Sequence, residues 1–168
     1  MSNLIVRAES KRDVDAISAL ITQAFKDDQY SQGTEAAIVN ELRDDGDLII
    51  SLVAELDGVV VGHVAFSPVT VDNEVVRYFG LGPVAVLPEH QQQGIGKALI
   101  TEGLTQLKAL GAHGCVVLGE PSYYQKFGFA VDEHVTLADV PPEYFTVNHF
   151  MEQTPKGEVR YASGFSAT

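Results

Sequence analysis

Residues 81–100 decide the fold, and they read LGPVAVLPEHQQQGIGKALI. An apolar strand ends in this stretch, a short polar loop follows, and a helix begins around Gly94 and Gly96. The first amide groups of a helix have no acceptor within it, and they point at whatever lies beyond its N-terminus. Neither glycine carries a side chain that would block approach, and the helix dipole favours negative charge there. The stretch therefore predicts a site for an anion such as a pyrophosphate.

The strand before this helix is interrupted. Gly80, Gly82 and Pro83 lie within an otherwise apolar run, and a proline inside a central strand implies a bulge or a lost ladder hydrogen bond. We expect the strand to splay there from its parallel neighbour and to leave unpaired backbone groups along a wedge-shaped gap. A ligand with amides along its length, such as pantetheine, could continue the ladder.

Other interpretations of the glycines are weaker. A P-loop requires a glycine where Gln91 stands and a hydroxyl residue where Ala98 stands. A dinucleotide-binding fingerprint requires a glycine in place of Leu99. If the two glycines stood alone, tight helix packing would be the preferred explanation. The interrupted strand before them favours a ligand site instead.

The rest of the chain is organised around this unit. The helix beginning near residue 94 joins strands 75–86 and 115–118, so those two strands should be parallel. We expect one domain, residues 1–168, of the α/β class, with a mixed sheet and helices on both faces. The remaining elements are predicted as strands at 4–8, 48–55, 59–66, 144–150 and 158–161, and as helices beginning after Ser10 and Thr34.

The central residues resemble the GNAT superfamily of N-acetyltransferases, whose hallmark is Gln/Arg-x-x-Gly-x-Gly/Ala after a bulged strand. The segment from Gln91 to Gly96 matches it position by position, and so do Val84-Ala85-Val86-x-Pro88 and Tyr124-x-x-x-Gly128-Phe129. This resemblance covers the central third of the chain. It implies a three-layer sandwich with a splayed central mixed sheet. It also implies transfer of the acetyl group from the cosubstrate acetyl-CoA to a primary amine of a small molecule or peptide.

The resemblance further implies a set of site residues. One tyrosine, Tyr124, would donate a proton to the departing thiolate, although it could instead anchor a short helix. The segment before it, residues 118–124, is shorter than in many relatives and lacks their Asn and Ala. The implied cofactor-binding residues are Val84, Ala85, Val86, Gln91, Gln92, Gln93, Gly94, Ile95, Gly96 and Lys97.

No general base stands out. Glu120 follows the parallel strand and is a candidate, although a solvated loop carboxylate is the simpler interpretation. Glu41 and Arg43 on the second helix, with Asp27 and Asp28 before it, either line an acceptor groove or are surface charges. For the acceptor, we hypothesise that a cationic amine binds in a groove framed by residues 26–34 and the turn near residue 155.

Composition narrows the function. A net charge of −12 with a pI near 4.6 argues against binding to nucleic acid. No apolar run reaches membrane-spanning length and no leader pattern is present, so we expect a cytoplasmic monomer or homodimer. Cys115 lies in an apolar strand, so we expect it to pack in the core rather than act as a nucleophile. The five histidines lie far apart in the sequence, and we therefore expect no metal site. The alternative to an enzyme is a non-catalytic acyl-CoA-binding or sensing domain.

Overall fold

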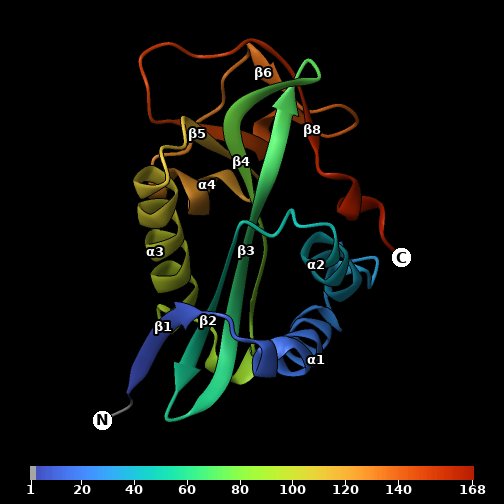
Figure 1. Ribbon diagram of the computed structural model, residues 1–168, viewed down its shortest axis with the longest axis vertical. Coiled ribbons are helices and arrows are strands. Elements are labelled where there is room, and N and C mark those ends of the chain that lie inside the picture. Colours follow the sequence, from blue (N-terminus) through green and yellow to red (C-terminus); the bar gives the residue numbers. More distant parts are fainter. Residues whose placement is uncertain (1–2) are drawn as a thin grey trace.

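The computed structural model describes residues 3–168, which form an open mixed sheet flanked by helices (Figure 1). The six strands of the main path run in the order β1-β2-β3-β4-β5-β7. Along the chain the elements are β1 (Leu4–Ala8), α1 (Val14–Phe25), α2 (Glu35–Asp44), β2 (Ile50–Leu56), β3 (Val59–Val71), β4 (Glu74–Val86), α3 (Ile95–Ala109), β5 (Gly114–Leu118), α4 (Pro121–Tyr124), β6 (Val135–Thr136), β7 (Phe145–His149) and β8 (Gly157–Tyr161).

The crossover through α3 makes β4 and β5 parallel, as predicted. β4 pairs antiparallel with β3 along one edge, from the turn at Asp72 and Asn73 back to Val86. The other edge of β3 is shared: β2 pairs with its first half and β8 with residues Val69 to Val71. A long β3–β4 hairpin is therefore the spine of the molecule, visible as the long green strands of Figure 1.

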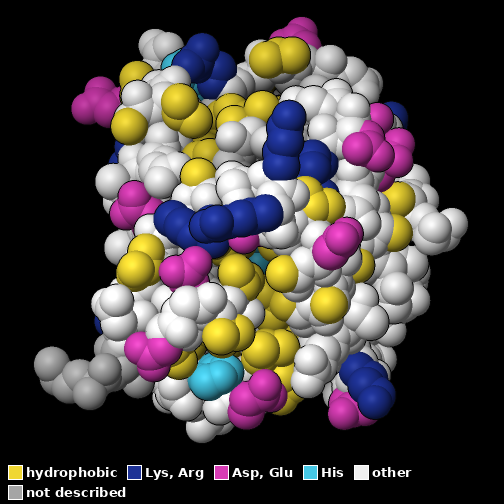
Figure 2. Space-filling model, turned by 60° about the horizontal axis from the view of Figure 1, so that its bottom comes forward, with side chains coloured by type: hydrophobic (Ala, Val, Ile, Leu, Met, Phe, Trp, Pro, Cys, Tyr) yellow, Lys and Arg dark blue, Asp and Glu magenta, His cyan; other side chains and the backbone are white. Residues whose placement is uncertain are grey.

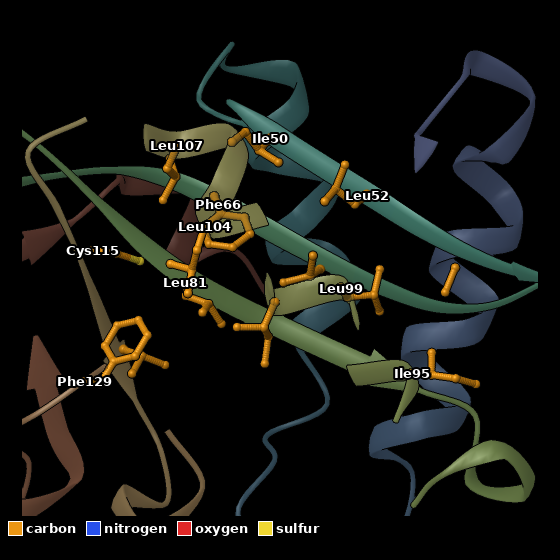
Figure 3. Close-up of a cluster of buried hydrophobic side chains, with 14 of the residues drawn as sticks. Ile50, Leu52, Phe66, Leu81, Ile95, Leu99, Leu104, Leu107, Cys115 and Phe129 are labelled. Atoms are coloured by element: carbon orange, nitrogen blue, oxygen red, sulfur yellow. The ribbon is translucent and has the colours of Figure 1, made fainter. Parts of the chain in front are cut away.

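Alternating side chains build a core on each face of this spine. On one face, α3 packs on β2, β3, β4 and β5, and Figure 3 shows this cluster around Phe66, Leu99 and Cys115. The close approach of α3 depends on Gly103, because a Cβ atom there would overlap the ring of Phe66. On the other face, Ile17 and Ile21 of α1 pack with Val39 of α2 against β2, β3 and β4. The predicted three layers are thus confirmed.

Two features differ from the sequence prediction. β3 continues to Val71 rather than ending at Phe66: its residues after Phe66 pair with β4 on one edge, and Val69–Val71 also pair on the other edge with β8, from the far end of the chain. The two-residue β6 was not predicted, and the short helix considered at Tyr124, which is α4, was given no bounds, since neither element is long enough to show a period. Within residues 3–168 no helix has the length and apolar character needed to cross a membrane.

Candidate active site

The parallel pairing of β4 with β5 stops early. It joins Tyr78–Leu81 to the residues from Gly114 to Val117 and goes no further. Just beyond Leu81 the strand bulges, since the β3 register moves from Phe66↔Leu81 to Val64↔Val84 and leaves the two residues Gly82 and Pro83 opposite the single residue Ala65. From this point β4 keeps only its β3 partner, and the predicted splay between β4 and β5 is present.

Backbone groups of alternate residues line the open edge of β4. Leu87 N–H donates to the Val61 carbonyl at 2.9 Å, so the backbone at Leu87 points toward β3. Because successive residues of a strand point to opposite neighbours, the backbone at Ala85 also points toward β3. The backbone groups of Val84 and Val86 then face the gap. Of the three residues predicted to pair with pantetheine, only these two are placed to do so; Ala85 instead pairs with His63.

The loop after β4 ends in an amide cradle. Gly94, the N-cap of α3, has φ +82°, and Gln92 has φ +63°. The first helical hydrogen bond runs from Ala98 N–H to the Gly94 carbonyl at 3.0 Å. The amides of residues 95–97 come before it and have no acceptor inside the helix. The side chain of Ile95 is buried against Gly62, so only its backbone can take part.

The glutamines of the loop hold the loop itself. Gln91 Nε2 donates to the Val86 carbonyl at 3.0 Å, which ties the loop to the end of β4. Gln93 Nε2 lies 3.5 Å from the Glu89 carbonyl, at the outer limit of a hydrogen bond. Both were predicted to contact the cofactor. The structure gives Gln91 a positioning role, which holds the cradle in line with the open edge.

Tyr124 lies at the β5 side of the gap. Its ring lies on Gly119, where a Cβ atom would be 2.6 Å from Cε2. Burial raises the pKa of Tyr124 to about 12, with Tyr123 and Cys115 contributing. The hydroxyl is therefore protonated at neutral pH, as a proton donor requires. Glu120 is exposed and caps α4, accepting from Ser122 Oγ at 3.1 Å. This capping contact favours the structural interpretation of Glu120 over a catalytic one.

Tyr123 lies beside the cradle, although nothing in the sequence favoured a site role for it over that of an aromatic anchor. Its hydroxyl would be 3.3 Å from a Cβ atom placed on Gly96, so it stands over the first turn of α3. Its ring also packs edge-on against Tyr124 at 5.1 Å between centroids. The two tyrosines of α4 thus reach the cradle and the gap respectively.

The predicted acceptor-groove residues separate in the structure. Arg43 forms an ion pair with Glu9 at 2.8 Å and is not directed at a groove. Asp28 lines a small pocket of about 180 Å³ with Lys26 and Glu35, between α1 and α2. The turn near residue 155 does not frame this pocket. It lies at the opposite end of the molecule, where Glu158 N–H bonds Asp72 at the hairpin tip (Figure 1).

Cys115 is not a nucleophile in this structure. It is fully buried, its side chain points into the α3-side core (Figure 3), and burial raises the pKa of its thiol well above the usual range. Its predicted packing role is confirmed. Over the described part of the chain, no three His, Cys, Asp or Glu residues are grouped so as to hold a metal ion.

Comparison with known proteins agrees with this geometry. The model of the acetyltransferase (GNAT) family matches residues 14–129, from the start of α1 to Phe129. The chain belongs to the GNAT family. Among its GNAT relatives is the uncharacterized N-acetyltransferase YhbS of Escherichia coli K12, 39% identical over 135 residues, covering 80% of this chain and 78% of YhbS.

Two solved GNAT structures are similar over nearly the whole chain. One is a GNAT family acetyltransferase from Brucella melitensis in complex with acetyl-CoA, with 42% identity, a TM-score of 0.88 and coverage of 97% of this chain and 98% of that one. The other is Escherichia coli YhbS in complex with CoA, with 32% identity, a TM-score of 0.90 and coverage of 99% and 93%.

Proposed function

We propose that this protein transfers the acetyl group of acetyl-CoA to a primary amine. The observation that carries the proposal is the continuity of the open β4 edge with the amide cradle of α3. Backbone groups at Val84 and Val86 face the gap, and the first turn of α3 lies beside them, since a Cβ atom on Gly96 would be 3.9 Å from Val86 Cγ2. An extended ligand with amides at one end and a pyrophosphate at the other matches this arrangement. Two similar GNAT proteins are in complex with acetyl-CoA or CoA.

The chemistry proposed is direct transfer. The neutral amine attacks the thioester carbonyl carbon, the carbon–sulfur bond breaks, and the sulfur leaves as a thiolate. Tyr124, protonated and at the β5 side of the gap, gives the thiolate its proton. The nitrogen loses its proton to solvent, and the tyrosinate left at Tyr124 takes up a proton from solvent, which restores the phenol. Val84 and Val86 hold the pantetheine, and Gly94, Gly96 and Lys97 surround the pyrophosphate.

The test is the release of free thiol from acetyl-CoA, measured with and without each member of a panel of primary amines. We expect release that depends on the amine, together with an acetylated product of matching mass. Binding of acetyl-CoA without amine-dependent release from any panel member would instead support the non-catalytic CoA-binding domain. Failure to bind acetyl-CoA at all would refute both functions.

A further inference from the structure

Tyr161 comes from the far end of the chain but lies in the middle of the sheet. It is the last residue of β8 and pairs with Val69 of β3. Its ring reaches as far as Gly80 of β4, where a Cβ atom would overlap it. Gly80 is the last residue but one before the β4–β5 pairing stops. Tyr161 packs with the cluster opposite α3, so its ring marks the start of the gap on that face.

Two phenol rings therefore flank the start of the gap, one on each face. Tyr124 packs with the α3-side core and lies on Gly119, just after β5. Tyr161 packs with the opposite face and lies on Gly80 of β4. Burial raises the pKa of Tyr161, and Cys115 and Tyr124 raise it further, so this phenol, like that of Tyr124, is protonated at neutral pH.

Neither hydroxyl is used by the fold. Within residues 3–168 the phenol oxygens of Tyr124 and Tyr161 make no hydrogen bond to protein, in contrast to Tyr78, which bonds His149. Both residues are partly buried, and neither phenol oxygen is among the fully buried side-chain atoms without a partner in this part of the chain. Each oxygen therefore keeps some exposed surface at which a bound group can form a hydrogen bond. A group bound in the gap can therefore meet one phenol from each side.

An aromatic wall stands beside Tyr161. The ring of Phe165 packs against it with 4.8 Å between centroids. Phe165 lies in the short turn Ser163–Ser166, which is fixed to α2 because the buried Gly164 contacts Leu42. The wall is thus held by α2 and places an aromatic ring beside the phenol ring of Tyr161.

We propose that Tyr161 positions the acceptor: its phenol oxygen accepts a hydrogen bond from the attacking nitrogen, and Phe165 contacts the apolar stem that carries the amine. The proposal rests on the acetyl transfer proposed above and extends it to a substrate class, primary amines on apolar or aromatic stems. A phenol held protonated orients the nitrogen without removing its proton. Tyr161 acts on the face opposite α3, and Tyr124 serves the leaving thiolate from the other face.

The experiment compares Tyr161→Phe with wild type, using phenethylamine and ethanolamine as probes. We expect wild type to favour phenethylamine. Loss of one hydrogen bond should lower kcat/KM for phenethylamine about 5- to 10-fold, mainly through KM for the amine. The thermal shift given by CoA should be unchanged. Tyr144→Phe, which removes an exposed phenol from the short turn before β7 and leaves its backbone contact with Gly119, is the matched control and should behave as wild type.

Three results would overturn the proposal. They are an unchanged KM for the amine in Tyr161→Phe, a loss of the CoA thermal shift in the same variant as large as its loss of amine activity, or a preference of the wild type for ethanolamine. If wild type turns over neither amine, acetyl transfer to these amines fails, and the role of Tyr161 is judged by binding. An additional thermal shift from phenethylamine on the CoA-loaded protein, lost in Tyr161→Phe, supports it. No additional shift in wild type refutes it. Phe165→Leu, which keeps the hydroxyl, should weaken phenethylamine more than ethanolamine.

Discussion

The hydroxyl of Tyr124 is the group on which the proposed chemistry depends most. Because it acts when thiolate charge forms, Tyr124→Phe should lower kcat by about 10²–10⁴-fold while leaving CoA affinity unchanged. The ring that lies on Gly119 is retained, so the fold should be unaffected. Steady-state kinetics with an active amine, together with CoA titration, measure both quantities. Wild-type turnover in this variant would return Tyr124 to an anchoring role and leave water as the proton donor.

A second residue-scale prediction concerns His63, which is fully buried under α1. Its Nε2 lies 2.7 Å from Ser51 Oγ, which in turn bonds Glu9, and its Nδ1 has no partner within the described residues. Burial lowers the pKa of His63 to about 4. The imidazole of the unfolded chain has a pKa near 6.5, so between about pH 6.5 and pH 4 the unfolded chain binds a proton that the native state does not. Stability contributed by the neutral imidazole is present above about pH 6.5 and is lost as pH falls toward 4.

His63→Gln keeps a donor toward Ser51 but removes the titration. The free energy of unfolding, measured by urea denaturation at several pH values, should therefore depend less steeply on pH between about 6.5 and 4. The slope should fall by up to one proton, about 1.4 kcal/mol per pH unit. His134→Gln, which removes an exposed imidazole, controls for loss of a histidine as such. Identical slopes in His63→Gln and wild type would show that His63 titrates normally in the native state.

Single residues differ in how far the sequence reveals them. The role of the cradle glycines could be predicted because the backbone requires glycine there and the residues around them form one continuous segment of the sequence. Tyr161 was not predicted because the pairing of β8 with β3 brings it to Gly80, a contact between residues far apart in the chain. A glycine inside an apolar strand was the one available signal, and it shows that space is needed without showing what fills it. The predicted contact of the Ala85 backbone with pantetheine could not be judged from the local sequence, because the direction of that backbone depends on the β3 register.

Among the elements, the α3 crossover was the most predictable. Its strand, loop and helix follow in order, and the handedness of such units leaves little freedom. The length of β3 was not predictable in the same way. Its residues beyond Phe66 pair with β4 on one edge, and the last three also pair with β8, which arrives from the C-terminal region. Elements stabilised by such distant pairing leave no local period in the sequence.

The first turn of α3 carries an element-scale prediction. Gly96→Val places a branched side chain among the free amides and toward the Tyr123 hydroxyl, so it should abolish the rise in Tm given by acetyl-CoA. Cooperative unfolding should persist, since Gly96 is partly exposed and has an ordinary helical φ. Ala109→Val, at the exposed last residue of the same helix, is the control and should keep the full shift. An undiminished shift in Gly96→Val would place the cofactor elsewhere.

At the scale of the whole molecule, charge is spread rather than focused. Figure 2 shows acidic side chains scattered over one face among basic and apolar ones. The net charge of −12 therefore does not by itself define an acceptor site. Several acidic groups are also committed to structure, because Asp13 pairs with Arg7 at 2.7 Å and Glu9 with Arg43 at 2.8 Å. A local charge effect on the acceptor can be tested at Asp28 and Glu35, which line the α1–α2 pocket together with Lys26.

The last prediction tests whether these two carboxylates attract a cationic amine. Two negative charges lining the pocket between α1 and α2 raise the local concentration of a cation there, and salt screens this attraction over about 10 Å at 0.1 M. With an active amine, wild-type kcat/KM should fall as salt rises, and Asp28→Asn/Glu35→Gln should lower it at low salt and flatten the dependence. The exposed pair Asp45→Asn/Glu74→Gln changes the net charge equally at other sites, and it should keep the wild-type slope. Equal slopes in all three proteins, or a preference for a neutral acceptor, would show that the two carboxylates serve only solubility. The choice of acceptor would then depend on the gap between the two tyrosines.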